Sequence, residues 1–180
     1  MKCAVKCAVK RAAALLGLGL LLSACPPPPE PEPDPNAPPD PHRFPTAECD
    51  PATTNPAALV QVGVGYGEFT PADEATPLPI VDADGVPFAY FSVRILYTRL
   101  SEVCLQYRLD LADPDQPAEA VSFDRHLLDP EVFAEGGGIV RGLAAPIEDP
   151  GAVSHRRALF VVDVGDGYTS GHTETFATFE

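Results

Sequence analysis

Lysine is almost absent from this 180-residue chain. The last lysine is Lys10, and every later basic residue is an arginine, apart from the histidines. With 12 basic residues against 26 acidic ones, the formal net charge is −14. Nucleic-acid phosphates require a basic face, and anionic lipid headgroups attract basic segments. The composition therefore argues against a protein that binds nucleic acid and against one that adheres to lipid by charge.

The motifs of nucleophilic and metal-dependent catalysis are also missing. The chain has no G-x-S-x-G nucleophile elbow. The histidines His126, His155 and His172 have neither H-x-H nor H-x-x-x-H spacing, so we expect surface histidines rather than metal ligands. The glycine run 136–138 lacks the lysine and the following helix of a phosphate loop, and we interpret it as a hinge. We therefore expect neither an enzyme nor a bound cofactor.

The apolar run near the N-terminus is too short to cross a bilayer. A transmembrane helix needs about 20 apolar residues, whereas residues 12–22 make up this run. It follows a basic start that contains Lys2, Lys6, Lys10 and Arg11. A short apolar run behind a basic start is typical of a secretory signal peptide rather than of a transmembrane helix.

The signal ends in Leu22-Ser23-Ala24-Cys25, which resembles the lipobox of bacterial lipoproteins. The resemblance covers the first 25 residues. It implies that a lipid is attached to the thiol of Cys25, that the chain is cut before this residue, and that the new N-terminus is acylated. Two or more acyl chains hold a protein stably on a membrane. The partner implied for Cys25 is therefore the lipid bilayer.

The residue after Cys25 is Pro26, not the aspartate that retains many enterobacterial lipoproteins in the inner membrane. The resemblance therefore implies the outer membrane, with the periplasmic and the cell-surface sides both open. Cleavage before Cys25 removes four of the basic residues and none of the acidic ones. Eight basic and 26 acidic residues remain, which gives the mature chain a net charge of −18.

Proline makes up about half of residues 26–45, and acidic residues are scattered among them. Proline fixes φ and has no N–H donor, so this segment is expected to be a disordered tether that reaches at most roughly 60 Å. Phe44 is its only large apolar residue and the expected first contact with the domain. The predicted organisation is a signal peptide at 1–24, lipidated Cys25 with the tether at 25–45, and one folded domain at 46–180.

Short apolar runs, separated by Gly, Pro and Asp, recur throughout residues 46–180, which is typical of an all-β domain. The strongest pattern lies in 88–97 and 102–111, where every second residue is apolar, and we expect these runs to pair as a central hairpin across 98–101. A second hairpin is expected to close the chain. The predicted strands are 58–65, 78–81, 88–97, 102–111, 118–123, 139–143, 156–164 and 172–179.

Seven or eight strands in this length resemble an immunoglobulin-like or fibronectin-type antiparallel β-sandwich. The resemblance is architectural, because the chain has no tryptophan to fill the core position of true immunoglobulin domains. Recognition in such sandwiches falls to the loops at the ends of the strands. The expected contact surfaces are Asp113–Pro117 and Gly165–Gly171.

Cys49 and Cys104 are the cysteines that remain after Cys25 in the mature chain. Outside the cytoplasm two such thiols are expected to form a disulfide. Cys104 lies on the polar parity of its strand, so the bridge should sit outside the sheet and fix the domain's N-terminus to it. The alternative, a redox or nucleophilic cysteine, has no C-x-x-C motif and no nearby histidine to support it.

Four aspartates, Asp82, Asp84, Asp163 and Asp166, flank glycines at the ends of predicted strands. Calcium binds carboxylate oxygens but takes six to eight of them, and no EF-hand pattern supplies such a set. Aspartate and glycine are also common in turns because they tolerate unusual φ values. We therefore interpret these aspartates as turn residues and predict no metal site.

These observations favour a non-enzymatic, membrane-anchored lipoprotein whose β-sandwich is a structural or binding module. The partner classes compatible with it are an envelope protein and a glycan. Two alternatives stay open: a calcium- or sugar-dependent adhesion module that uses the acidic turns, and an envelope hydrolase whose site the sequence does not reveal.

Overall fold

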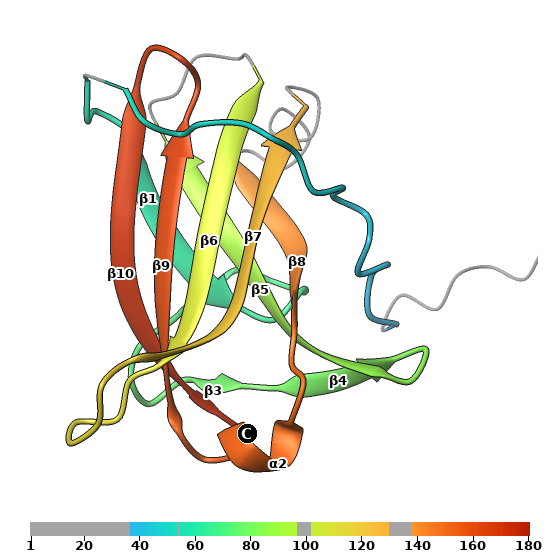
Figure 1. Cartoon of the computed structure of the whole chain (residues 1–180). Helices are drawn as coiled ribbons and strands as arrows, with labels where there is room; N and C mark the ends of the chain where they lie inside the picture. Colours follow the sequence, from blue (N-terminus) through green and yellow to red (C-terminus); the bar gives the residue numbers. More distant parts are fainter. Residues whose placement is uncertain (1–36, 54, 97–101, 130–137) are drawn as a thin grey trace, which may run out of the picture. The chain divides into compact units, whose positions relative to one another are not determined.

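Two β-sheets face each other in the computed structural model, which describes residues 37–53, 55–96, 102–129 and 138–180 (Figure 1). In these ranges the regular elements are strands, apart from the four-residue helix α2, Pro150–Val153. The prediction of an all-β sandwich is therefore confirmed. None of the described residues belongs to a helix that is long and apolar enough to cross a membrane.

The first sheet is built around its longest strand, β5. β1 pairs with the C-terminal half of β5, β4 pairs with its N-terminal half, and β8 pairs along most of its length. All of these pairs are antiparallel. The bounds are β1 Leu59–Val64, β2 Thr70–Pro71, β4 Ile80–Ala83, β5 Val86–Leu96 and β8 Ile139–Pro146.

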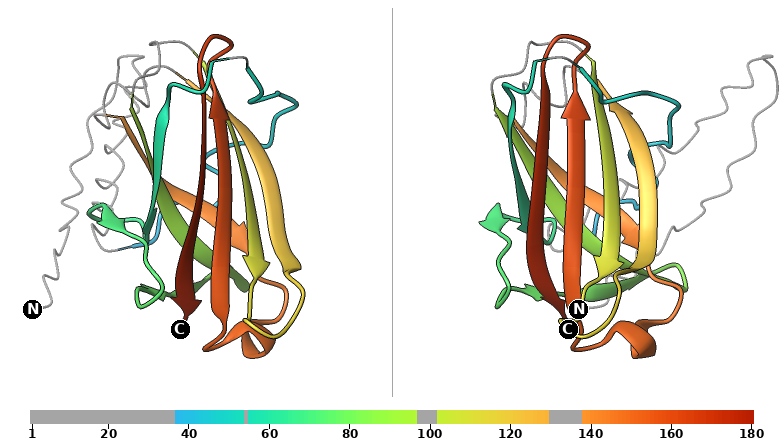
Figure 2. Two further views of the ribbon diagram at one scale, coloured as in Figure 1. Left: turned by 90° about the vertical axis from the view of Figure 1, so that its left-hand side faces the viewer. Right: turned by 60° about the vertical axis from the view of Figure 1, so that its left-hand side comes forward.

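The second sheet has the order β3-β10-β9-β6-β7. Its pairs are antiparallel except for β3, which runs parallel to β10. Figure 2 shows the two sheets as separate layers. Seven of the described strands have six or more residues; three of them lie in the first sheet and four in the second, which is an immunoglobulin-like layout. The bounds are β3 Pro77–Leu78, β6 Val103–Leu111, β7 Glu119–Leu128, β9 Arg157–Gly165 and β10 Ser170–Phe179.

The prediction that 88–97 and 102–111 pair as a hairpin is wrong. β5 belongs to the first sheet and β6 to the second, and the two strands face each other across the core. The rings of Phe91 and Tyr107, for example, lie 5.0 Å apart. The apolar parity of a strand is buried against the facing sheet whichever strand is its hydrogen-bonded neighbour, so alternation alone does not say whether two strands pair or face each other. The connection at 98–101 lies outside the described residues.

The predicted C-terminal hairpin is confirmed. β9 and β10 pair antiparallel from Arg157 opposite Thr178 to Gly165 opposite Ser170. The predicted inward residues of β9 are all fully buried, and they are Ala158, Phe160, Val162 and Val164. The run 118–123 is also a strand, but it continues to Leu128, where the sequence did not predict one.

The outer face of the first sheet is partly covered, which alternation does not predict. Tyr90 and Ser92 point away from the core, yet their relative exposures are 0% and 1%. The Tyr90 hydroxyl donates to the Pro39 carbonyl at 3.0 Å, and the Ser92 hydroxyl donates to the Gly65 carbonyl at 2.9 Å. The described residues from Ala37 to Glu180 belong to one compact unit. It therefore includes part of the segment expected to be the tether, and Phe44 packs in the core.

Candidate functional site

Residues 49–58, of which residue 54 is not described, form a strap across one end of the second sheet (Figure 1). The predicted disulfide fixes its beginning: Cys49 and Cys104 are bridged, with their Cα atoms 5.8 Å apart. Cys104 lies on the outward parity of β6, as predicted, but the strap leaves it only 4% exposed. The Ser170 carbonyl fixes the far end of the strap, because it accepts a hydrogen bond from the Ala58 N–H at 2.9 Å.

Two glycines let the strap lie directly on the sheet. A Cβ atom on Gly165 would collide with the Pro51 carbonyl, and one on Gly171 would lie 2.6 Å from the Ala58 carbonyl oxygen. Real Cβ atoms do not approach other atoms this closely. The predicted contact loop 165–171 thus begins and ends with the residues over which the strap passes.

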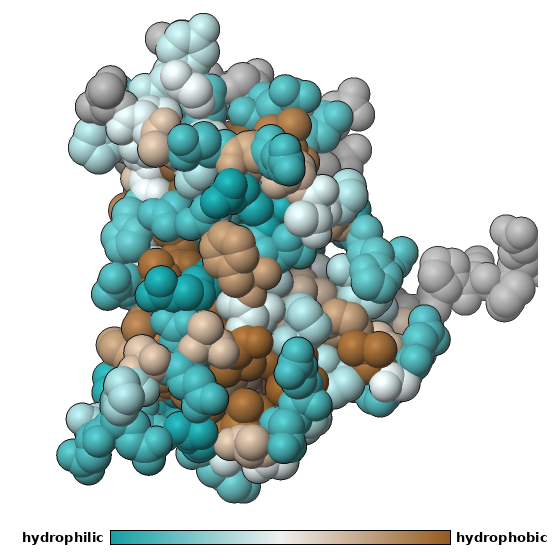
Figure 3. Space-filling model, in the orientation of Figure 1, coloured by the Kyte–Doolittle hydropathy of each residue, from teal (hydrophilic) through white to brown (hydrophobic). Residues whose placement is uncertain are grey.

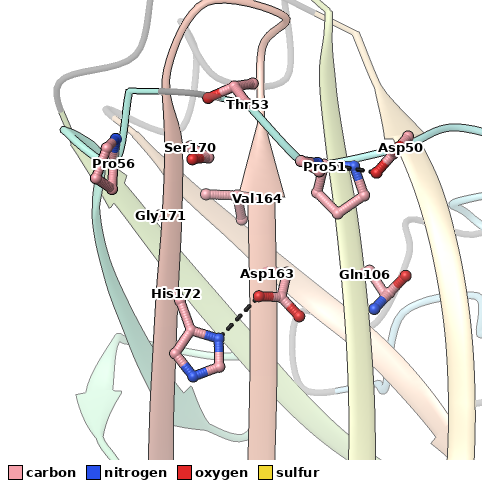
Figure 4. Close-up of a pocket in the computed structure, with 11 residues that line it drawn as sticks. Asp50, Pro51, Thr53, Pro56, Gln106, Asp163, Val164, Ser170, Gly171 and His172 are labelled. Atoms are coloured by element: carbon pink, nitrogen blue, oxygen red, sulfur yellow. Dashed lines mark hydrogen bonds and ion pairs between the residues drawn. The ribbon is translucent and has the colours of Figure 1, made fainter.

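Between the strap and β6, β9 and β10 lies a pocket of about 320 Å³, here called the strap pocket (Figure 4). The strap forms one wall, and the outer faces of the three strands form the floor. Most side chains that line it end in a carboxylate, an amide, a hydroxyl or an imidazole. These polar residues are Asp50, Thr53, Gln106, Asp163, Ser170 and His172.

An imidazole and a carboxylate are paired on the floor of this pocket. Asp163 on β9 lies directly opposite His172 on β10, and His172 Nδ1 is 2.8 Å from Asp163 Oδ1. On its other side, His172 Nε2 is 3.5 Å from Glu174 Oε1. The hydrogen bond to Asp163 raises the pKa of His172 above its usual value, and the charge of Glu174 acts in the same direction. The sequence placed His172 on the surface, where it lies, but did not connect it with Asp163.

The raised pKa predicts how this pair affects stability. A group that binds its proton more tightly in the folded state stabilises the protein fully below its unfolded pKa, about 6.5 for histidine, and loses this effect as the pH rises through the folded pKa. Exposed pairs contribute about 0.2–1 kcal/mol. Urea unfolding should therefore give wild type a larger free energy of unfolding than His172→Gln near pH 6, and this difference should shrink toward pH 9. An advantage that grew with pH would contradict the assigned pairing.

The four aspartates considered for calcium lie at two separate places. Asp84 lies in the turn between β4 and β5 and Asp166 in the turn between β9 and β10, as predicted, whereas Asp82 lies in β4 and Asp163 in β9 (Figure 1). Asp82 accepts the Gly85 N–H at 2.9 Å, and Asp166 accepts backbone N–H groups of its own turn. Among the described residues no group of three or more His, Cys, Asp or Glu could hold a metal ion.

The two predicted contact loops do not come together. Asp113–Pro117 follows β6 at the other end of the sandwich from Gly165–Gly171, and Asp113 forms an ion pair with Arg156 at 2.7 Å. Only the second loop contributes to the strap pocket, through Ser170 and Gly171. Cys25 lies outside the described residues, as do two of the glycines in 136–138.

A second cavity, here called the edge cavity, has a volume of about 540 Å³. It lies where β7 of one sheet approaches β5 and β8 of the other, with residues 41–46 beside it. Its lining is mostly apolar, with a polar end formed by Thr46, Asp124 and His126. His42 also lines the cavity, and its ring lies edge-on to that of Phe88 with 6.3 Å between the centroids. The apolar lining residues are Pro41, Phe44, Pro45, Val86, Phe88, Ala144 and Pro146.

The prediction that His126 is a surface histidine is wrong, because the residue is only 5% exposed. Its ring stacks on Tyr107 with 5.9 Å between the ring centroids. Burial raises the pKa of Tyr107 to about 12, and the Tyr107 hydroxyl donates to the Ala144 carbonyl at 3.2 Å. His155, by contrast, is exposed, as predicted.

The orientation of the two faces of β7 explains why His126 is buried and not on the surface. Phe123 and Leu127 are 56% and 43% exposed, whereas Asp124 and His126 point inward to the edge cavity. A register shift between Leu109 and Asp110 of the neighbouring β6 accompanies this arrangement. Figure 3 shows hydrophobic residues interrupting the hydrophilic outer surface of this sheet. Phe123 and Leu127 therefore point outward, against what their apolar character predicts, whereas Leu128 of the same strand is buried in the core.

Comparison with known proteins found no family model that matches this chain and no significant match among curated proteins.

Proposed function

We propose that this chain is a lipoprotein of the bacterial outer membrane, attached through acylated Cys25, and that its β-sandwich is a non-enzymatic module that binds a glycan in the strap pocket. The proposed glycan binding rests on the strap pocket, which is lined by six polar side chains. It lies at an end of a rigid sandwich, beside a loop, where recognition sites are common.

The proposed location outside the cytoplasm rests on two features that are far apart in the chain. One is the lipobox that ends in Cys25. The other is the disulfide between Cys49 and Cys104, because structural disulfides persist in oxidising compartments and are rare in the cytosol. The same disulfide holds the strap, so the compartment that oxidises these thiols also completes the pocket.

The ligand class follows from the chemistry of the lining. A sugar hydroxyl both donates and accepts hydrogen bonds, so it suits a pocket that offers both kinds of group. The carboxylates of Asp50 and Asp163 accept, whereas an amide such as that of Gln106 also donates. A volume of about 320 Å³ lies at the lower end of the range of small-molecule sites, about 300–1,000 Å³. The sugar-binding alternative is thus the one that this pocket favours.

A glycan array probed with the mature protein, extracted from membranes in detergent, tests this proposal. Wild type should bind a discrete set of glycans, and Asp163→Asn should weaken that binding about tenfold or more. Hydrogen bonds to charged groups contribute about 1.5–3 kcal/mol, and 1.4 kcal/mol is a factor of ten. Asp115→Asn removes an equal charge from the exposed loop 113–117 and should bind like wild type. Absence of binding by wild type, or equal binding by Asp163→Asn, would reject the strap pocket as a glycan site.

A further inference from the structure

The edge cavity has the form of a ligand site that the proposed glycan binding does not use. It lies on the β7 side of the second sheet, whereas the strap pocket lies over β6, β9 and β10. Its volume of about 540 Å³ falls well within the range of small-molecule sites. Such sites are mostly apolar with a few polar groups that fix the ligand's orientation. The edge cavity likewise has mostly apolar walls, with four polar side chains, those of His42, Thr46, Asp124 and His126.

The polar end contains a buried group that lacks a hydrogen bond. His126 Nε2 is out of contact with solvent and has no hydrogen-bond partner among the described residues. A buried polar atom of this kind costs free energy unless a partner is supplied. The nearest charged atom is Asp124 Oδ2, at 3.9 Å.

The hydrogen bonds around His126 indicate which role Nε2 has. His126 Nδ1 lies 3.4 Å from the Pro45 carbonyl oxygen, and a carbonyl can only accept. We therefore assign a proton to Nδ1, and in the tautomer that carries this proton alone Nε2 presents a lone pair. Asp124 Oδ2 is also an acceptor, and it already takes the hydroxyl of Thr46 at 2.9 Å. Two acceptors thus face each other across 3.9 Å with no donor shared between them.

We propose that the edge cavity binds a small primary amine with an apolar body, whose ammonium group bridges Asp124 and His126. An ammonium nitrogen at ordinary hydrogen-bond distance from both atoms fits a separation of 3.9 Å, and its several N–H donors can serve both acceptors. Phe44 and Phe88 are 9% and 6% exposed, and they give the apolar body a wall of aromatic carbon. The high negative charge of the chain favours a cationic ligand over a neutral or anionic one.

The inverted faces of β7 support this site. Polar side chains point inward at Asp124 and His126, while Phe123 and Leu127 of the same strand remain exposed. Burying polar residues and exposing apolar ones costs free energy on both counts. A ligand that pairs with the inward polar groups offsets the first of these costs.

Ligand-observed ¹⁹F NMR tests the proposal with 4-fluorobenzylamine and 4-fluorobenzyl alcohol, which share a ring and differ in the charged donor. Full-length protein should bind the amine at least tenfold more tightly than the alcohol. Asp124→Asn should remove most of this preference, whereas Asp115→Asn should keep it. The protein variants are compared in the same detergent, so partitioning of the probes into micelles cancels.

Two further results make the outcome decisive. Asp163→Asn, which alters the strap pocket, should leave amine binding unchanged, so failure of this proposal and failure of glycan binding are distinguishable. If Asp124→Asn does not fold, the preference of wild type for the amine over the alcohol still decides the question. Equal binding of the two probes, or binding of neither, would overturn the proposed site.

Discussion

Replacing Cys49 and Cys104 together by serine is expected to lower the free energy of unfolding by about 4 kcal/mol, the value that the chain-entropy model gives for a cross-link of this span. The two cysteines are 55 residues apart in the sequence, so the bridge removes many conformations from the unfolded chain. Urea unfolding monitored by circular dichroism measures the effect. Glycan binding should weaken as well, because the strap forms one wall of the strap pocket.

Reductant provides the control for this variant. It should destabilise wild type by a similar amount and leave the double serine variant unchanged, since the variant has no bridge to lose. A loss below about 1 kcal/mol in the double variant would mean that the hydrogen bonds of the strap, such as the one from Ala58 to Ser170, fix this segment without the disulfide.

Replacing Cys25 by serine is expected to move the protein from the membrane pellet to the soluble fraction of the envelope. Each buried methylene of an acyl chain contributes about 0.8 kcal/mol, and two or more chains hold a protein stably. A serine cannot receive the thioether-linked lipid, so the anchor is lost. Fractionation followed by immunoblotting measures the change.

Cys7→Ser is the matched control, because Cys7 lies in the predicted leader and should be removed with it. This variant should stay in the membrane fraction like wild type. A Cys25→Ser protein that still sedimented with membranes after washing in high salt would contradict lipid anchoring at this residue.

Strong local patterns were sufficient to predict much of the sandwich. In β9 every second residue from Ala158 to Val164 is apolar. This pattern predicts the buried face of the strand, which contains Phe160. Cys104 shares its face of β6 with polar residues such as Gln106 and Arg108, so its thiol could be predicted to point away from the core. In each case one face of a strand must meet the core, and the sequence states which face it is.

The pairing of β5 and the orientation of β7 could not be predicted in the same way. The apolar parity of β5 shows which face meets the core, but it does not show whether β6 is a neighbour in the same sheet or a strand of the facing sheet. Ser92 and His126 are polar but buried because residues distant in sequence, at Gly65 and Pro45, cover them. Coverage of this kind depends on the tertiary fold.

The strap pocket was only partly within reach of the sequence. Once 156–164 and 172–179 are paired, Asp163 and His172 lie opposite each other near the turn, so the pair could have been found from the predicted hairpin. The wall made by Asp50 and Thr53 could not, because no pattern in the strap indicates which strands it crosses.

The intact mass and N-terminal sequence of the protein extracted from membranes test the central claim most directly. We predict a chain that begins at Cys25 and carries a diacylglyceryl group on sulfur and an acyl group on its amino terminus. A chain that retains residues 1–24, or one that begins at Cys25 with a free thiol, would contradict it.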